Sequence, residues 1–174
     1  ELMGGSIRVE SAQGAGTKFT VDISFDTASE EDVYRNQISE QPDILEKLKG
    51  KRILLAEDND LNAEIAIELL AEEKIVVDRA KDGAECLDKL EQADPGYYDM
   101  ILMDIQMPVM DGYDAAARIR RMKDEKKASI PIIAMTANAF AEDRQKAISM
   151  GMNDHVAKPI DMNVLLPVIA KYIR

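Results

Sequence analysis

Apolar and polar residues alternate one by one in two stretches near the start of the chain. The alternating apolar positions are Ile7, Val9, Phe19, Val21, Ile23 and Phe25. A period of two is typical of strands with one buried face, and a glycine-containing segment at 13–17 separates the stretches, so residues 1–26 are predicted to form a β-hairpin. A lone hairpin has too little apolar contact to be stable. We therefore expect it to pack against the rest of the chain or to self-associate with a second copy.

From residue 51 onward, short apolar runs alternate with segments whose apolar residues recur at helical spacing. The runs predicted to be strands are 53–56, 75–77, 100–103, 131–135 and 155–157. The segments predicted to be helices are 61–69, 83–92, 113–122, 139–150 and 161–173. Right-handed crossovers between parallel strands place helices on both faces of a sheet. The pattern therefore predicts an α/β fold with a doubly wound, five-stranded parallel sheet in the flavodoxin-like order 2-1-3-4-5, preceded by the hairpin.

The segment between the hairpin and the first α/β strand has a different character. Residues 27–50 are polar and show little periodicity until Ile44, Leu45 and Leu48, which predict a linker ending in a short helix. Farther along, the charged run 120–127 is predicted to be a solvated helix end and loop. The predicted organisation is a hairpin at 1–26, a linker at 27–50 and an α/β domain at 51–174.

Composition narrows the class of protein. With 174 residues, 46% of them hydrophobic, the chain can form one packed domain and an appendage. A net charge of -11 argues against binding nucleic acid or an anionic membrane, because both require a basic surface. Cys86 is the single cysteine and no apolar run is long enough to span a membrane, so we expect a cytoplasmic location. Because the sequence begins at Glu1, it is expected to be a piece of a longer protein.

Polar side chains with complementary chemistry follow four of the predicted strands. They are Glu57 and Asp58 after the first strand, Asp104 after the third, Thr136 after the fourth and Lys158 after the fifth. The carboxyl ends of parallel strands meet at one edge of the sheet, so these side chains are expected to converge where the winding direction reverses. Three neighbouring carboxylates repel one another unless they bind a cation, and hard oxygen ligands favour Mg²⁺. The sequence therefore predicts a magnesium site.

The other polar residues at this edge predict the reaction. The hydroxyl of Thr136 and the ammonium of Lys158, facing a metal-bound carboxylate, form a cradle for a phosphoryl group. Phosphoryl transfer needs mainly in-line positioning and charge neutralisation, so Asp104 is the predicted nucleophile. The predicted product is an aspartyl phosphate at this residue.

These residues lie in motifs that resemble the receiver domains of two-component response regulators across residues 51–174. The matching motifs are Glu57-Asp58, Asp104 with Met107-Pro108 and Asp111-Gly112, Met135-Thr136-Ala137, and Lys158-Pro159. The resemblance implies that Asp104 accepts a phosphoryl group from a phosphohistidine, and that Thr136 and Lys158 bind its oxygens. The Mg²⁺ ligands that it implies are Glu57, Asp58, Asp104 and the backbone carbonyl of Gln106.

The resemblance also implies a conformational switch and two partners. In the switch, Thr136 moves toward the phosphate and the residue three positions before the lysine turns inward. That residue is His155 here, whereas many receivers carry tyrosine or phenylalanine. The implied donor is the phosphohistidine of a histidine kinase dimerisation domain, and the implied recipient is a histidine phosphotransfer protein. The residues implied to dock these partners are Leu61, Asn62, Ile65 and Ala66.

The start of the chain resembles the end of a histidine kinase ATP-binding domain. The matching residues are Met3-Gly4-Gly5-Ser6-Ile7-Arg8-Val9-Glu10-Ser11 and Gly14-Ala15-Gly16-Thr17-Lys18-Phe19. This resemblance implies that the parent protein is a hybrid sensor histidine kinase, which can be membrane-anchored. The fragment itself is expected not to be an enzyme, because the upstream nucleotide-binding boxes and the phosphorylatable histidine are absent from it.

Two other classes of function share part of this pattern. A Mg²⁺-dependent phosphohydrolase also forms an aspartyl phosphate, but it needs a substrate-enclosing cap and a second aspartate two residues after the nucleophile, where this chain has Gln106. A phosphorylation-independent interaction module would require neither the acidic residues nor Lys158.

Overall fold

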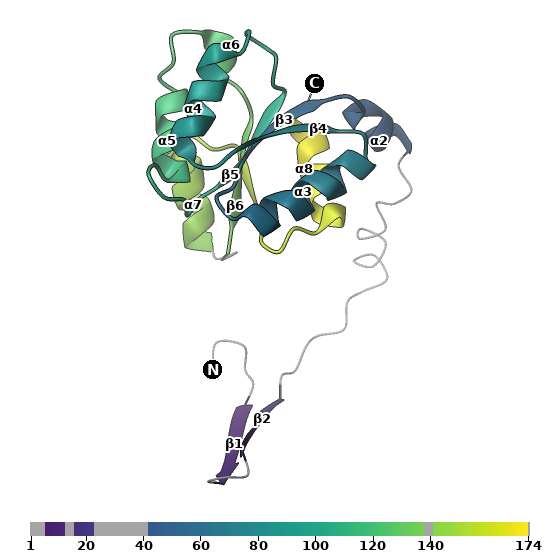
Figure 1. The fold of residues 1–174 in the computed structure, drawn as a ribbon, viewed down its shortest axis with the longest axis vertical. Coiled ribbons are helices and arrows are strands. Elements are labelled where there is room, and N and C mark those ends of the chain that lie inside the picture. The colour runs from purple at the N-terminus through teal and green to yellow at the C-terminus, as the bar shows by residue number, and fades with distance from the viewer. Residues whose placement is uncertain (1–5, 13–15, 23–41, 138–140, 174) are drawn as a thin grey trace. The chain divides into compact units, whose positions relative to one another are not determined.

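The computed structural model describes residues 6–12, 16–22, 42–137 and 141–173 (Figure 1). The chain divides into two compact units, Glu1–Gln37 and Ile38–Arg174. Among the helices described, none combines the length and the apolar character needed to cross a membrane.

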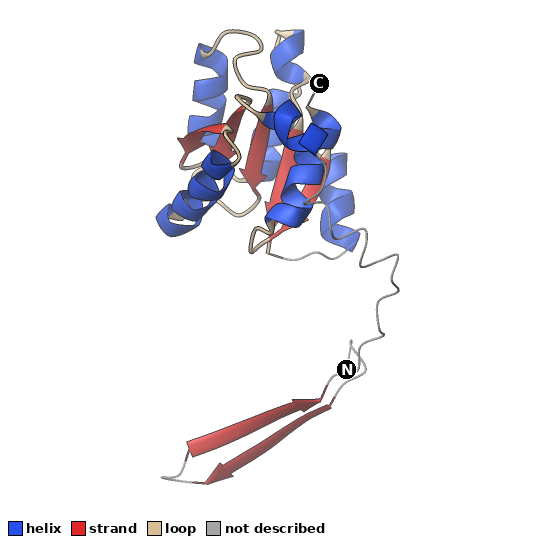
Figure 2. Cartoon of the chain, turned by 90° about the vertical axis from the view of Figure 1, so that its right-hand side faces the viewer, coloured by secondary structure: helices blue, strands red, loops and turns tan. Residues whose placement is uncertain are grey.

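The first unit contains the predicted hairpin, formed by β1 (Ser6–Ala12) and β2 (Gly16–Asp22) as antiparallel partners (Figure 2). Ile7 lies opposite Val21, and Val9 lies opposite Phe19, so one face is apolar. These side chains are exposed, at 69%, 54%, 55% and 67% respectively. Ile23 and Phe25, which were expected to extend this face, lie outside the described residues. Packing of the hairpin against the rest of the chain, or against a second copy, stays a prediction.

The second unit has the predicted α/β architecture. Its strands are β3 (Arg52–Ala56), β4 (Val76–Ala80), β5 (Met100–Asp104), β6 (Ile132–Thr136) and β7 (Asp154–Ala157). Its helices are α2 (Pro42–Leu48), α3 (Asp60–Glu72), α4 (Gly83–Gln92), α5 (Gly112–Ile119), α6 (Glu125–Ala128), α7 (Ala141–Ser149) and α8 (Met162–Tyr172). The strands are parallel and their order is β4-β3-β5-β6-β7. The predicted order 2-1-3-4-5 is therefore confirmed.

Helices cover both faces of this sheet, and each face has its own apolar cluster (Figure 1). On one face, Leu54 and Ile101 pack with residues of α4 and α5, such as Cys86 and Ile119. On the other face, alternate strand residues pack with residues of α3 and α8. Because β5 and β6 are buried on both faces, every residue in them is buried. This packing explains why their sequences are continuous apolar runs ending in one polar residue.

The helix predicted at the end of the linker belongs to this unit. Leu48, the last residue of α2, is fully buried in the cluster that includes α8. The chain then turns at Gly50, whose N–H donates to the carbonyl of Lys74 at 2.8 Å. The start of the α/β unit is thus anchored at the amino ends of the strands, away from the predicted site residues.

Two local predictions need correction. The second strand runs to Ala80 and not to Val77. The prediction ended too early because Asp78 and Arg79, on this edge strand, interrupt the apolar pattern. The run 120–127 is not uniformly solvated: it contains part of α6, and Arg120 is partly buried. The Arg120 guanidinium donates to the carbonyls of Gly151 at 2.7 Å and of Ala128 and Ile130 at 2.8 Å, and to Asn153 Oδ1 at 2.8 Å. Burial lowers the pKa of Arg120, but these acceptors pair with the hydrogen-bond donors of the partly buried guanidinium.

Candidate functional site

All five polar residues predicted from the strand ends line one cavity. The cavity has a volume of about 400 Å³ and lies at the carboxyl edge of the sheet. Its lining includes Glu57, Asp58, Asp104, Thr136 and Lys158. Their elements converge because β3 lies beside β5, and β6 and β7 follow in the same direction.

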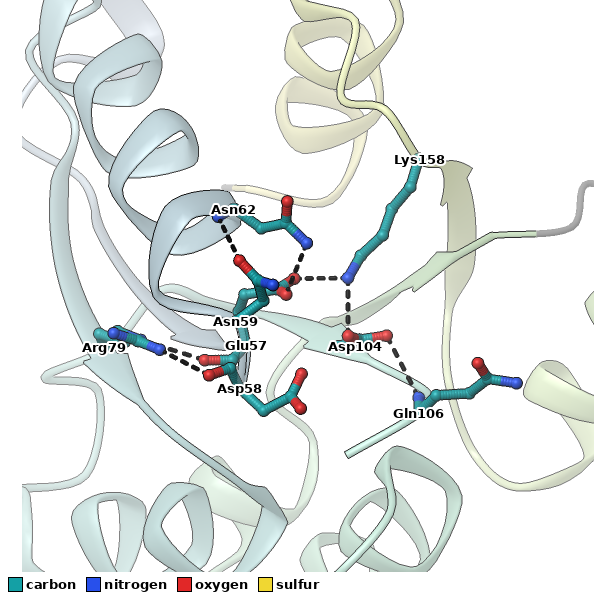
Figure 3. A network of polar contacts seen from close by, with 8 residues as sticks. All are labelled: Glu57, Asp58, Asn59, Asn62, Arg79, Asp104, Gln106 and Lys158. Carbon is teal, nitrogen blue, oxygen red and sulfur yellow. Dashed lines mark hydrogen bonds and ion pairs between the residues drawn. The ribbon is translucent and has the colours of Figure 1, made fainter. Parts of the chain in front are cut away.

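Lys158 connects two of the carboxylates (Figure 3). Its Nζ donates to Glu57 Oε2 at 2.5 Å and to Asp104 Oδ2 at 2.6 Å. The side chains of Glu57 and Asp104 are only 3% and 9% exposed. The ion pairs therefore form away from bulk water, where charge-assisted hydrogen bonds are strong. The peptide bond between Lys158 and Pro159 is cis.

The remaining oxygens of these two carboxylates have partners of their own. Asn62 Nδ2 donates to Glu57 Oε1 at 3.1 Å, and the backbone N–H of Gln106 donates to Asp104 Oδ1 at 3.2 Å. Asn62 is placed by the start of α3, where its N–H donates to Asn59 Oδ1, the N-cap, at 3.0 Å. Both carboxylates are thus held in fixed orientations.

The cavity carries an excess of negative charge. Glu57, Asp58 and Asp104 each place an oxygen within 4.8 Å of the others. At that separation two unit charges repel by about 3.5 kcal/mol at an effective dielectric constant of about 20. Lys158 is the one cation that forms an ion pair with these carboxylates among the described residues, so the three carboxylates exceed their paired cation by two charges.

The pKa values of the charged groups reflect this environment. Burial raises the pKa of Asp104 above its usual range, and the charge of Glu57 adds to this effect. Burial acts to lower the pKa of Lys158, but hydrogen bonds and charges from Asp104 and Glu57 outweigh it and raise that pKa. Lys158 therefore stays protonated, and a further cation beside Asp104 would favour the charged form of that carboxyl.

The donor set fits a magnesium ion. Three carboxylates supply hard oxygen ligands, and the described cavity lining contains neither histidine nor cysteine. A divalent cation would balance the two negative charges left by Lys158. The side chain of Asp58 is exposed to the cavity and keeps its oxygens open to such an ion.

The other predicted residues have more varied positions. Thr136 is 7% exposed and lines the cavity, as predicted for a phosphate-binding hydroxyl. His155 does not line it. The Nδ1 of His155 is buried, 3.6 Å from Asp154 Oδ1, and has no hydrogen-bond partner in the described structure. Of the predicted docking residues, Leu61 and Ile65 are 65% and 47% exposed, whereas Ala66 is only 2% exposed.

The position of Ala66 requires a correction. It packs into the apolar cluster beneath α3, because residues three and four positions apart face the same side of a helix and Ala63 and Leu70 are buried there. Of the four residues predicted to dock partners, the exposed ones are therefore Leu61, Asn62 and Ile65.

Sequence reasoning missed three side chains around the site. Arg79 supports the Glu57–Asp58 turn through contacts with its backbone. Tyr113 and Lys146 line the cavity, with Lys146 Nζ 4.3 Å from the centre of the Tyr113 ring. Arg79 is next to last in β4, and Tyr113 and Lys146 lie in helices α5 and α7, so none of them ends a strand or directly follows one, as the other five do.

A doubly wound sheet with an acidic pair, an aspartate, a threonine and a lysine at its carboxyl edge defines the receiver class of signalling domains. The chain belongs to this family: residues 53–170 match the response regulator receiver domain. The similarity extends over most of the second unit.

Curated relatives of the chain include hybrid histidine kinases and sensor proteins. Hybrid signal transduction histidine kinase L of Dictyostelium discoideum is 40% identical over 141 residues, which cover 79% of this chain and 8% of that protein. Aerobic respiration control sensor protein ArcB of Escherichia coli is 33% identical over 170 residues, which cover 98% of this chain and 21% of that protein. The chain thus spans a small part of each relative.

Two solved receiver domains are also similar. One is the receiver domain of sensor histidine kinase PA1611 from Pseudomonas aeruginosa, with a magnesium ion coordinated in its active site cleft. It is 37% identical to this chain, the match covers 71% of this chain and 97% of that one, and the TM-score is 0.63. The other is the receiver domain of Ssk1 from Saccharomyces cerevisiae, in complex with the histidine phosphotransfer protein Ypd1. It is 31% identical, covers 72% of this chain and 90% of that one, and gives a TM-score of 0.65.

Proposed function

We propose that this chain accepts a phosphoryl group from a phosphohistidine onto Asp104 in a Mg²⁺-dependent reaction and relays it to a histidine phosphotransfer protein. The observation that carries the proposal is the contact of Lys158 with both Asp104 and Glu57, at a cluster of three carboxylates that exceeds its one paired ammonium by two charges. Phosphoryl transfer depends on positioning and on neutralising the charge of the phosphoryl oxygens, which a fixed ammonium and a divalent cation beside a carboxylate nucleophile would supply.

In the proposed reaction, an oxygen of Asp104 attacks the phosphorus atom in line with the bond to the histidine nitrogen. The new O–P bond forms as the P–N bond breaks, and the electron pair of the P–N bond remains on the imidazole. Glu57, Asp58, Asp104 and the carbonyl of Gln106 would hold Mg²⁺, which when bound supplies positive charge to the phosphoryl oxygens. Lys158 neutralises another oxygen, and the hydroxyl of Thr136 donates to a third. Thr136 and His155 would then carry the switch.

Several observations support the relay. A groove of about 370 Å³ beside the site is lined in part by Ile65, Lys158, Pro159 and Ile160. Together with exposed Leu61, it offers a partner an apolar surface next to the acceptor. A receiver of similar fold is known in complex with a histidine phosphotransfer protein. We infer that such a protein docks on Leu61, Asn62 and Ile65.

The origin of the chain is a second part of the proposal. The relatives include a hybrid histidine kinase and the sensor proteins EvgS and ArcB, and the similarity to ArcB covers 98% of the chain. The hairpin is therefore proposed to be the end of a kinase ATP-binding domain, and the parent to be a hybrid histidine kinase. The fragment alone is proposed to act as an acceptor and not as a kinase.

Intact-mass spectrometry tests the acceptor role. The chain is incubated with phosphoramidate, a small donor with a P–N bond, with and without Mg²⁺. The expected result is one added phosphoryl group that is absent without Mg²⁺ and absent in Asp104→Asn. Transfer from the phosphorylated chain to a histidine phosphotransfer protein then tests the relay. A folded, Mg²⁺-binding chain that never gains a phosphoryl group, even at short times, would refute the proposal.

A further inference from the structure

Arg79 contacts the acidic turn without entering the cavity (Figure 3). It is the next-to-last residue of β4, the edge strand beside β3, and its side chain is 19% exposed. Its Nε donates to the carbonyl of Glu57 at 3.0 Å, and its Nη2 donates to the carbonyl of Asp58 at 3.0 Å. One planar guanidinium therefore holds two successive carbonyls.

The same end of β4 holds the turn at another point. The N–H of Glu57 donates to the carbonyl of Ala80 at 3.0 Å, so both backbone polar groups of Glu57 are bonded to β4 residues. Orienting the peptide units on both sides of Glu57 also orients the Cα–Cβ bond from which its carboxylate extends. With the carbonyl of Asp58 held as well, the direction of both acidic side chains depends on this edge strand.

Helix α4 in turn supports this end of β4. Lys89 Nζ donates to the carbonyl of Arg79, and Lys89 pairs with Glu85 at 3.0 Å. Glu85 Oε2 accepts the N–H of Lys81 at 2.8 Å. The backbone from which the Arg79 side chain extends is thus held by α4, as a positioning residue requires.

We propose that Arg79 is a positioning residue for the magnesium ligands, which aims the carboxylates of Glu57 and Asp58 into the cavity through their backbone carbonyls. This inference rests on the proposed magnesium-dependent function. Groups that orient metal ligands contribute to metal affinity without touching the metal, and their loss typically weakens binding by about tenfold or more. Because the Arg79 guanidinium bonds two carbonyls at once, its planar shape is expected to affect Mg²⁺ affinity as well as its charge.

A second contact of Arg79 supplies the control. Its Nη1 pairs with Asp60 Oδ1 at 2.6 Å, but the Asp60 side chain is 83% exposed. An exposed ion pair of this kind contributes little. Removing the Asp60 carboxylate therefore tests whether the ion pair, and not the contact with the turn, is what matters.

The experiment uses the 174-residue chain and the variants Arg79→Gln, Arg79→Lys and Asp60→Asn. Isothermal titration calorimetry measures the Mg²⁺ dissociation constant, and the rate of phosphorylation by phosphoramidate is measured across Mg²⁺ concentrations. Both Arg79 variants are expected to weaken Mg²⁺ binding about tenfold, whereas Asp60→Asn stays near wild type. At saturating Mg²⁺ the maximal rate of each variant is expected to return to near the wild-type value.

Other outcomes would overturn the inference. Wild-type affinity in Arg79→Lys would mean that charge alone suffices, and equal losses in Asp60→Asn would assign the effect to the ion pair. A low maximal rate at saturating Mg²⁺ would place the defect outside metal binding. Far-UV circular dichroism checks folding, and if Arg79→Gln does not fold, Arg79→Lys carries the test.

The wild-type chain separates this inference from the function on which it rests. If wild type binds Mg²⁺ and is phosphorylated while the Arg79 variants match it, only the positioning role fails. If wild type does neither, the proposed function fails, and the role of Arg79 fails with it.

Discussion

Replacing Asp104 by asparagine should make the thermal stability of the protein almost insensitive to Mg²⁺. In the absence of the ion, the change removes the repulsion of Asp104 by Glu57 and by Asp58. Each repulsion is about 3.5 kcal/mol at an effective dielectric constant of about 20, taken at 4.8 Å, the largest distance between the oxygens of these carboxylates. It also removes the attraction to Lys158 at 2.6 Å, which is about 6 kcal/mol by the same estimate. These contributions nearly cancel.

Burial then decides the sign. It raises the pKa of Asp104, so the charged form is less favourable in the fold than in the unfolded chain. A raised carboxyl pKa means that the ionised group subtracts stability at neutral pH, and that this loss disappears as the pH falls and the group is protonated. Without Mg²⁺, the asparagine variant is therefore expected to be at least as stable as wild type.

Magnesium should reverse that ranking. At a Mg²⁺ concentration one hundred times its dissociation constant, binding to the native state alone adds about 2.7 kcal/mol to the free energy of unfolding. For a domain of this size, that corresponds to an increase in Tm of about 8 °C. Asp104→Asn lacks a ligand and is expected to gain less than about 2 °C.

Thermal unfolding followed by circular dichroism at pH 7 measures both effects, with NaCl at equal ionic strength as the control for screening. Equal Mg²⁺-induced shifts in wild type and Asp104→Asn would refute the assignment of Asp104 as a ligand. A variant that is several degrees less stable without Mg²⁺ would show that the pairing with Lys158 outweighs repulsion and burial.

Two further predictions concern stability away from the site. Arg120→Met should lower the free energy of unfolding by about 3 kcal/mol in urea denaturation, because it leaves partly buried carbonyls without donors. The exposed neighbour change Arg121→Met should stay within about 0.5 kcal/mol, and equal effects of the two changes would contradict the role of the partly buried Arg120 cation. Asp154→Asn should cost about 1 kcal/mol at pH 7. Burial acts to raise the pKa of Asp154, but donors including Lys171 lower it below the ordinary value of 3.8. The stabilisation is thus present above that pH and is lost as the pH falls through the lower folded value, so a cost that is unchanged between pH 7 and pH 3 would contradict it.

Local pattern was sufficient to predict the sheet and the residues at its carboxyl edge. A strand buried on both faces must be apolar along its length, so β5 and β6 were evident as runs that stop at Asp104 and Thr136. Crossover handedness predicted helices on both faces of the sheet, whereas the order of the strands was taken from the flavodoxin-like arrangement of doubly wound sheets. The sequence pattern was weaker for the edge strand β4, because Asp78 and Arg79 interrupt its apolar run.

Only the tertiary structure decided which groups meet. Lys158 and Glu57 are 101 positions apart, and no local rule connects their atoms. The roles of Arg79 and Arg120 were equally hidden, because a cation in a charged stretch is usually solvated and only the fold shows which backbone carbonyls surround it. Strand and helix periodicity arise from contacts among near neighbours, whereas the orientation of a buried charge depends on the packing of several distant segments at once.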